Sequence, residues 1–278
     1  MTFTVKMCGL TFGGNQPPHV MGILNLSPES FYKNSVRDSF SILEAAQKMV
    51  DDGASLLDVG ARSTSPWAEV ISVEEEKKRL FAALEELSGN ISVPISVDTM
   101  YADVAEGALN RGAEIINDIS GLKADDRMGS VIADHDACTV LMATQKIPGD
   151  PLGMDAVMSA LSNAVSIAEN AGIGSDKIIL DPAIGHWIPE KTAEYDFEVI
   201  NQFEKFSVFN MPVLIAVSRK SFLNSAVEKP AEDRLIPSLT AAAIAAYKGG
   251  HIVRTHDVSE TAEAMKVVWA VRNQSGSI

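Results

Sequence analysis

The sequence predicts an α/β fold, a (β/α)8 barrel of the TIM type with a short N-terminal β-hairpin. Short apolar runs rich in β-branched residues alternate with longer segments of helical periodicity, as in repeated βα units. Eight such runs occur, which is the number that closes this barrel. The length of 278 residues is also close to the usual size of about 250, so we expect one domain over 1–278.

The predicted strands are nearly continuous apolar segments. This character is typical of parallel strands that are buried on both faces of the sheet. The eight strands are expected at residues 20–26, 56–61, 95–99, 114–119, 139–144, 178–182, 213–218 and 252–255.

Helical patterns occupy the segments between these runs. Ser41 and Glu44 have the spacing of a capping box, so a helix is expected to begin there. A further helix is expected at Val73–Leu87, and an Ala-rich helix at 239–247. Asp257 is placed to cap the last helix.

The N-terminal residues differ from the βα pattern. Two short β-like stretches lie on either side of Gly13 and Gly14. Because paired glycines favour tight turns, we expect a hairpin that turns there and covers the bottom of the barrel.

Charge and composition narrow the class of protein. The formal net charge of −14 argues against nucleic acid and anionic membranes as partners, although a local anion site remains compatible with it. We find no secretory signal and no apolar stretch long enough to span a membrane. The two cysteines, Cys8 and Cys138, are far apart and form no CxxC motif. We therefore expect two thiols in a cytoplasmic protein.

Polar side chains gather where the predicted strands end, which is where barrels of this kind carry their chemistry. Capping explains one such Asp, but not a polar residue at the end of seven of eight strands. Three residues suit a flat heterocycle that bears N–H groups: Asp98, Asn117 and Asp181. Four basic residues suit an anionic tail at the usual phosphate corner: Arg219, Lys220, Arg254 and His256.

Seven local motifs point to one family. They are Met21-Gly-Ile-Leu-Asn25-Leu-Ser-Pro28, Leu57-Asp-Val-Gly60 with Ser63-Thr64, Ser96-Val-Asp98-Thr99, Ile115-Ile-Asn117-Asp118, Asp181-Pro182 with Ile184-Gly185, Ser218-Arg-Lys220-Ser221 and Arg254-Thr-His256-Asp257. In this order they resemble the motifs of the dihydropteroate synthase family. The resemblance covers about 20–268, and residues 26–32 resemble archaeal-type members.

The resemblance implies a reaction. A dihydropterin that carries a methyl diphosphate condenses with an arylamine, in the standard case p-aminobenzoate, and pyrophosphate leaves. The C–O bond breaks largely before the amine attacks. Mg2+ accompanies the diphosphate, and the enzyme is a cytoplasmic homodimer of folate biosynthesis.

The resemblance also implies roles for individual residues. The pterin edge is expected to contact Asp98, Asn117, Asp181 and Lys220. The diphosphate is expected to contact Arg254, His256 and, through Mg2+, Asn25. The arylamine side is expected to involve His186 and Ser221, whereas Thr64 is expected near the reacting centre and Met142 is expected to touch substrate. The residues expected to take part in catalysis are Asp98, Asp181, Lys220, Arg254 and His256.

The chain departs from the family pattern on the arylamine side. Ser65 stands where an Arg is usual, and Arg62 precedes the motif instead. His186 replaces an aromatic residue, and the fifth strand ends without the usual His-Met pair. A related acceptor, such as a ribosylated aminobenzene phosphate of methanopterin biosynthesis, is therefore an alternative to p-aminobenzoate.

Three other functions remain open at this point. A methyltetrahydropterin:corrinoid methyltransferase shares the pterin-edge residues but does not need the cationic corner. A Schiff-base aldolase on the same fold would use Lys220 as its nucleophile. A non-catalytic pterin-binding relative would bind the pterin without turnover.

Overall fold

A parallel sheet forms the centre of the computed structural model, which describes residues 3–26, 41–62 and 71–274. The neighbours in this sheet follow the order β8-β7-β6-β5-β4-β3-β10-β9. A parallel bridge between Leu180 and Val213 joins the two outer strands of that order. The strands are β3 His19–Asn25, β4 Leu56–Gly60, β5 Ile95–Asp98, β6 Ile115–Asp118, β7 Cys138–Met142, β8 Ile178–Asp181, β9 Leu214–Ile215 and β10 Ile252–Thr255. The predicted (β/α)8 barrel is confirmed.

One predicted strand is much shorter than expected. The run at 213–218 contributes only Leu214–Ile215, whereas the other strands end within two residues of their expected limits. A turn follows, in which the Lys220 N–H donates to the carbonyl of Val217, and Arg219 takes a φ of +57°. Backbone in turn geometry cannot continue a parallel ladder, so β9 ends early.

The expected N-terminal hairpin is present, but its turn is not where the glycine pair suggests. Strands β1 Thr4–Met7 and β2 Leu10–Gly13 are joined by Cys8 and Gly9, with φ values of +47° and +71°. Two successive positive φ values are the geometry of a tight hairpin turn. Gly13 instead ends β2, where a Cβ atom would lie 2.2 Å from the carbonyl oxygen of Phe3.

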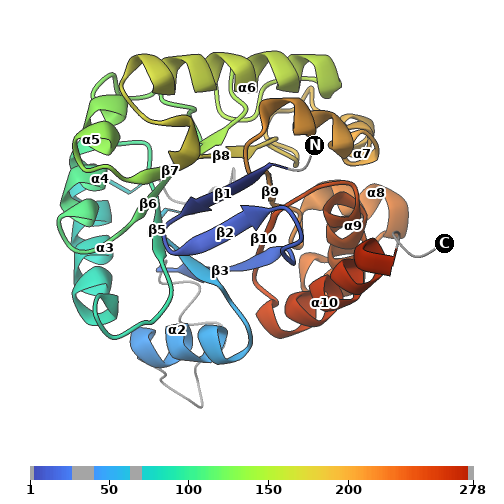
Figure 1. Cartoon of the computed structure of the whole chain (residues 1–278), viewed down its shortest axis with the longest axis horizontal. Coiled ribbons are helices and arrows are strands. Elements are labelled where there is room, and N and C mark those ends of the chain that lie inside the picture. Colours follow the sequence, from blue (N-terminus) through green and yellow to red (C-terminus); the bar gives the residue numbers. More distant parts are fainter. Residues whose placement is uncertain (1–2, 27–40, 63–70, 275–278) are drawn as a thin grey trace.

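The hairpin closes the lower end of the barrel. Met7 and Phe12 are buried in a cluster with residues from the beginnings of the strands, among them Met21, Leu56 and Ile252. Figure 1 is viewed from this end, with β1 and β2 lying across the front of the barrel and the helices forming a ring around it. The opposite end, where the strands finish, is therefore the one available for a binding site.

Helices surround the barrel, and along the chain a helix follows each of its strands. Ser41 caps the first described helix through the expected capping box with Glu44. The Ala-rich helix begins at Leu235, four residues earlier than expected. No helix within the described ranges is long and apolar enough to cross a membrane. The α-helices are α2 Ile42–Asp51, α3 Val73–Leu87, α4 Ala102–Leu109, α5 Met128–Asp134, α6 Gly153–Asn170, α7 Ala193–Asn201, α8 Asn224–Val227, α9 Leu235–Tyr247 and α10 Val258–Gln274.

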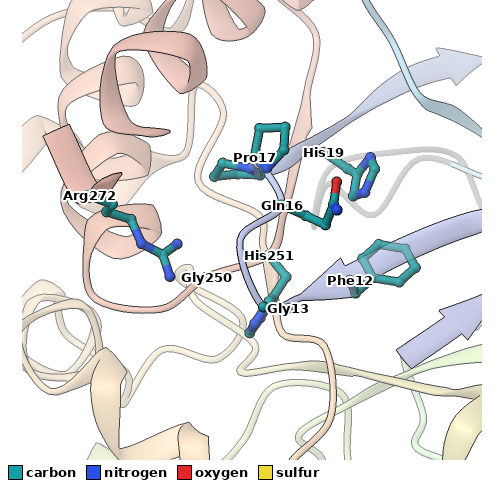
Figure 2. Close-up of a pocket in the computed structure, with 10 residues that line it drawn as sticks. Phe12, Gly13, Gln16, Pro17, His19, Gly250, His251 and Arg272 are labelled. Carbon is teal, nitrogen blue, oxygen red and sulfur yellow. The ribbon is translucent and has the colours of Figure 1, made fainter. Parts of the chain in front are cut away.

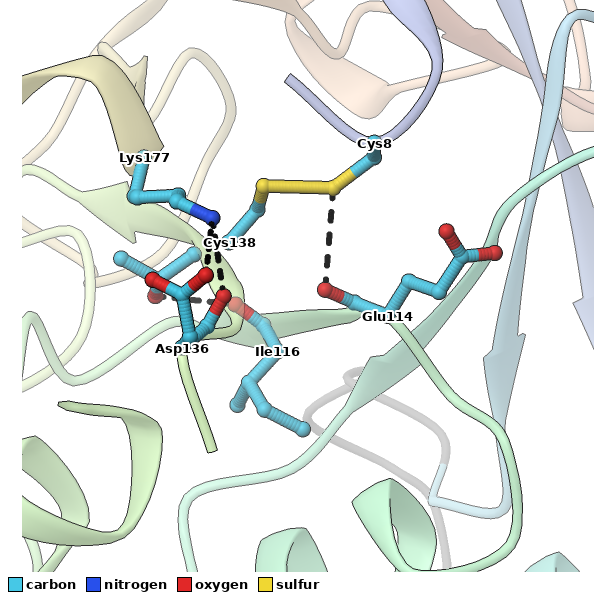
Figure 3. The surroundings of a disulfide bond; sticks show 7 residues. Cys8, Glu114, Ile116, Asp136, Cys138 and Lys177 are labelled. Carbon is cyan, nitrogen blue, oxygen red and sulfur yellow. Dashed lines mark hydrogen bonds and ion pairs between the residues drawn. A yellow bond between two sulfur atoms is a disulfide. The ribbon is translucent and has the colours of Figure 1, made fainter. Parts of the chain in front are cut away.

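The expectation of two separate thiols is wrong in this structure, because Cys8 and Cys138 form a disulfide. The bond joins the hairpin turn to the beginning of β7 (Figure 3). The sulfur of Cys8 also lies 3.7 Å from the carbonyl oxygen of Glu114, the residue before β6. The sequence separation of 130 residues hid this proximity, since only the packing of the hairpin under the barrel creates it.

Replacing Cys8 with Ser tests the disulfide. We expect Cys8→Ser to lower the free energy of unfolding by about 2 to 4 kcal/mol without reductant, because a long loop is no longer closed in the unfolded chain. With excess dithiothreitol, the variant and the original protein should unfold at the same urea concentration. Titration of two thiols in air-oxidised, denatured original protein would contradict the pairing.

Candidate active site

A row of polar side chains lines the upper mouth of the barrel. The strand register pairs Asn25 with Gly60, Gly60 with Asp98, and Asp98 with Asn117. These residues therefore stand at one level of the sheet, on four neighbouring strands. Two further strands bring in Asp181 at the end of β8 and Arg254 in β10.

Arg254 joins two carboxylates at the centre of this mouth. Its Nε atom lies 2.6 Å from Asp58 and one Nη atom lies 3.2 Å from Asp98. Asp58 is fully buried and also accepts a hydrogen bond of 2.6 Å from Ser96 Oγ. The guanidinium thus neutralises carboxylates that would otherwise be costly to bury.

Asp98 is the less buried of these two carboxylates, with 13% of its side chain exposed. Burial and the neighbouring charge of Asp58 raise the pKa of Asp98 to about 7, although Arg254 opposes the shift. A carboxyl group with a pKa near neutrality in a cleft is typical of functional sites. Asp98 can therefore change between acceptor and donor within the physiological range.

Asn117 presents an acceptor to the same space. Its Nδ2 atom donates to Asp58 over 3.1 Å, which fixes the orientation of the amide. Its Oδ1 atom is buried and has no hydrogen-bond partner among the described residues. Because buried polar atoms are rarely left unsatisfied, this oxygen suits an N–H group of a ligand.

Asp181 and Lys220 form the opposite wall. Asp181 accepts a hydrogen bond of 2.8 Å from the Ala183 N–H, and burial raises the pKa of its carboxyl group while Lys220 opposes the shift. The Lys220 Nζ atom donates to the carbonyl of Ile184 and lies 5.2 Å from the centre of the Trp187 ring. Burial lowers the pKa of Lys220 to about 8.

His256 lies beside the ends of β9 and β10. Its Nδ1 atom is 3.0 Å from Ser218 Oγ, and its backbone N–H donates to the same oxygen over 3.2 Å. The side chain is open to solvent, yet desolvation by the surrounding mouth and the charge of Arg254 lower its pKa. A neutral imidazole is therefore the resting form.

Arg219 does not join the cationic corner. Its guanidinium binds the carboxylate of Asp257 through two hydrogen bonds of 2.9 and 2.5 Å, and also donates to the carbonyl of Glu232. This geometry assigns Arg219 to the loop after β9. The sequence expectation placed it with Lys220 because the last two strands carry the usual phosphate corner of this fold.

The remaining candidates lie on separate loops and strands. Ser221 is exposed at the start of a short 3-10 turn, Ser221–Leu223, and His186 is exposed in the loop after β8. Met142 is fully buried at the end of β7. Thr64 and Ser65 lie outside the described residues. The roles expected of these residues remain predictions.

Sequence reasoning missed Asp58 as a site residue, although it quoted the motif that contains it. An Asp within an otherwise apolar strand is the signal that identifies it. Glu76 in α3 was also missed: it is fully buried, forms an ion pair with Arg62, and accepts a hydrogen bond of 2.7 Å from Thr99 Oγ1. These contacts tie Arg62, which closely follows β4, and Thr99, which follows β5, to α3.

A separate small cleft opens at the other end of the barrel. Figure 2 shows it between the hairpin and the beginnings of β3 and β10. Burial lowers the pKa of both His19 and His251 there. None of the expected site residues lines it; the labelled ones are Phe12, Gly13, Gln16, Pro17, His19, Gly250, His251 and Arg272. The cleft therefore does not belong to the site.

Known proteins resemble the chain over nearly its whole length. The family model described as "Pterin binding enzyme" matches residues 21–256. Dihydropteroate synthase of Bacillus subtilis is 40% identical over 258 residues, which cover 92% of this chain and 90% of that protein. The solved dihydropteroate synthase of Coxiella burnetii, in complex with pteroic acid, has a TM-score of 0.84 at 33% identity and covers 97% of this chain and 98% of that one.

A second solved structure holds an arylamine. Dihydropteroate synthase of Xanthomonas albilineans with 4-aminobenzoic acid has a TM-score of 0.85 at 30% identity and covers 98% of this chain and 99% of that one. The family-model match, over residues 21–256, spans the strand ends that carry the buried polar residues. The chain belongs to the pterin-binding enzymes and, within them, to the dihydropteroate synthase family.

Proposed function

We propose that the chain transfers the methylene-pterin group of a dihydropterin methyl diphosphate to the amine of p-aminobenzoate, releasing pyrophosphate in folate biosynthesis. The observation that carries the proposal is the cluster at the barrel mouth. Two pKa-shifted carboxyl groups, an amide oxygen without a described partner and a half-buried lysine lie at this mouth. This set matches the donors and acceptors along the edge of a pterin ring.

The ring is held by complementary groups on opposite walls. Asp98, Asp181 and the Asn117 oxygen accept N–H groups, and Lys220 donates to an acceptor of the ring. As the C–O bond breaks, positive charge grows on the pterin. Carboxylates that are already fixed in a buried site stabilise this charge more in the transition state than in the ground state.

The leaving pyrophosphate needs donors at the mouth. Arg254 has five N–H donors, and its bonds to Asp58 and Asp98 account for two of them. About a fifth of its side chain is exposed, so the remaining donors can meet an anion. His256 stands two residues further along, where its ring can donate to a phosphate oxygen.

The residues at the mouth also fit a magnesium ion that arrives with the diphosphate. Mg2+ in phosphate-transfer sites commonly takes one or two protein ligands and completes its shell with phosphate and water. The part of the chain that the structure describes contains no cluster of three or more His, Cys, Asp or Glu side chains suited to a metal. Asn25, at the end of β3, would hold the ion through its amide oxygen, and the ion would neutralise charge on the leaving group.

The identity of the amine acceptor rests on the comparisons with known proteins. The high identity to the Bacillus subtilis synthase and the similarity to a structure that holds 4-aminobenzoic acid support p-aminobenzoate. We propose Ser221, at the start of its turn, and His186 as the residues that contact the carboxylate end of that amine. The changes at Ser65 and His186 then alter contacts around the same acceptor.

Turnover with defined acceptors tests the proposal. The purified protein is incubated with the dihydropterin methyl diphosphate, Mg2+ and either p-aminobenzoate, its ribosylated phosphate analogue or no amine, while pyrophosphate is measured. We expect release and dihydropteroate formation with p-aminobenzoate. Release with the analogue alone would move the enzyme to a methanopterin-type pathway. Pterin binding without release in every tube would overturn the synthase assignment.

The pH dependence follows from two groups of the pterin site. The pKa is about 7 for Asp98 and about 8 for Lys220, so an ionised Asp98 and a charged Lys220 coexist only in a narrow range of pH. We expect kcat/KM for the pterin to fall below the lower value, as Asp98 gains a proton, and above the higher value, as Lys220 loses one. In Lys220→Arg the alkaline limb should disappear from the measured profile, because arginine stays charged. A flat profile in the original protein would contradict this assignment.

We also propose that the chain is a homodimer. Five large apolar side chains are exposed on α9 and α10, which pack against each other, and at about 100° per residue those of each helix share one side: Ile236, Ile244, Tyr247, Val267 and Val271. An apolar patch of this kind is typical of an interface. Val267→Glu should convert the protein to a monomer in light scattering. Ile147→Glu, at a similarly exposed apolar residue in the loop after β7, should leave it dimeric.

A further inference from the structure

The loop after β8 forms the wall on which Lys220 rests. Ala183 has a φ of +59° and Gly185 has a φ of +134°, both in the left-handed half of the backbone map. A Cβ atom on Gly185 would lie 2.8 Å from Cδ of Lys220. The Lys220 Nζ atom donates to Ile184, between these two residues. The position of the ammonium group therefore depends on a backbone conformation that is costly for Ala183 to adopt.

A second lysine holds this loop from behind. Lys191 is 1% exposed, and its Nζ atom donates to the carbonyl of Ala183 over 2.6 Å and to that of Gly149 over 3.4 Å. Gly149 belongs to the loop after β7, and Trp187 packs so closely on it that a Cβ atom would lie 2.1 Å from the ring. One ammonium group thus ties two loops of the mouth together.

Asp196, in α7, completes the arrangement. Its Oδ1 atom accepts a hydrogen bond of 2.8 Å from the Gly185 N–H and lies 3.7 Å from Lys191 Nζ. Its Oδ2 atom is buried with no hydrogen-bond partner among the described residues. Both side chains are essentially inaccessible to solvent.

We propose that Lys191 and Asp196 are a positioning pair, which fixes the Ala183–Gly185 backbone and through it places Lys220 against the bound pterin. The inference rests on the proposed synthase function. Neither residue faces the mouth, so neither touches substrate. The bonds of the pair go to loop backbone on both sides of the Lys220 contact, rather than to the hydrophobic core.

A role in stability alone explains this geometry of the Lys191–Asp196 pair less well than a positioning role does. Burying two charges costs more free energy than an apolar pair of the same size in many proteins, so stability alone gives little reason for the pair. The left-handed backbone conformation of Ala183 and the close contact between Gly185 and Lys220 persist only if neighbouring groups hold this backbone in place. Lys191 and Asp196 supply one on each side of Ile184.

The charges of the pair also act on Lys220 directly. Lys220 faces Asp181 and Asp196, which raise its pKa, and Arg254 and Lys191, which lower it, while burial has the largest effect and lowers it. Asp196→Asn keeps an oxygen that can accept from Gly185 but removes one negative charge. It should therefore shift the alkaline limb of kcat/KM to lower pH, and adding Lys191→Met should shift it back.

The experiment compares three variants with the original enzyme. In the double variant Lys191→Met with Asp196→Asn no buried charge is left unpaired, so we expect a folded protein. Because Lys191 no longer holds Ala183 and Gly149, KM for the pterin should rise about tenfold or more, whereas KM for the arylamine should stay within about twofold. Ile132→Ala, at a buried side chain of α5, is the control, which should lower the thermal midpoint without changing either KM.

The outcomes separate the two hypotheses. If the original enzyme shows no turnover, the proposed function fails. If it turns over while the double variant keeps its pterin KM and Asp196→Asn leaves the alkaline limb in place, the pair is structural only and the positioning role is overturned. A rise in pterin KM together with the limb shift in Asp196→Asn supports it.

Discussion

Arg254→Met is expected to abolish most of the activity and to destabilise the fold. The variant keeps the alkyl chain but leaves the fully buried Asp58 and the nearby Asp98 without their cation. Removing one partner of a buried charge pair costs about 3 to 5 kcal/mol of folding free energy. The loss of a donor at the leaving pyrophosphate should lower kcat by about 100- to 1000-fold.

Two measurements distinguish these effects. Urea unfolding gives the stability loss, and kcat is measured at a temperature at which the variant is still folded by circular dichroism. Arg254→Met with Asp58→Asn removes one of the two carboxylates as well, so it should recover part of the stability but not the activity. Lys248→Met, which breaks an exposed ion pair with Glu204, should change the free energy of unfolding by less than about 1 kcal/mol. Unchanged turnover in Arg254→Met would rule out its role at the diphosphate.

The barrel could be predicted from the sequence because its signal is local and repeated. Each parallel strand is buried on both faces and reads as an apolar run, and the capping box at Ser41 marks a helix start on its own. The errors lie where distant contacts decide the structure. Gly13 is a glycine because Phe3 approaches it, not because the chain turns there. Cys8 meets Cys138 only because the hairpin folds under the barrel.

The part of the candidate site that lies at strand ends could be predicted from the sequence. Asp98, Asn117, Asp181 and Arg254 do meet at one mouth, as parallel strands of a barrel require. Asp58 was missed because it lies inside its strand, where an acidic residue is uncommon. Its role depends on three partners from other strands.

The residues that support the site were the least predictable. Lys191 and Asp196 bind backbone atoms of loops, and a carbonyl group carries no sequence signature. Glu76 lies in the first turn of a helix, where acidic residues are common, so its sequence position gave no sign of a special role. Only the fold shows that it points inward to Arg62 and Thr99.

Asp181→Asn is expected to lower activity strongly with little effect on stability. The amide has the size of the carboxylate, and its oxygen can still accept from the Ala183 N–H, which lies 2.8 Å from Asp181 in the structure. Burial raises the pKa of Asp181, so the ionised form is penalised in the folded protein. A neutral side chain escapes this penalty. The variant should therefore be as stable as the original protein above neutral pH, or slightly more so.

The activity loss has a different origin. The amide carries no negative charge to stabilise the cation that grows on the pterin, so kcat should fall by about 100- to 1000-fold. Pterin binding, which uses Asp98, Asn117 and Lys220 as well, should weaken much less. Fluorescence titration of the pterin, urea unfolding and pyrophosphate release measure the three quantities separately, with Asp176→Asn at an exposed position as the matched control. If kcat and pterin affinity fell by the same factor, Asp181 would serve ground-state recognition alone, and the charge developing on the ring would have to be stabilised by Asp98 instead.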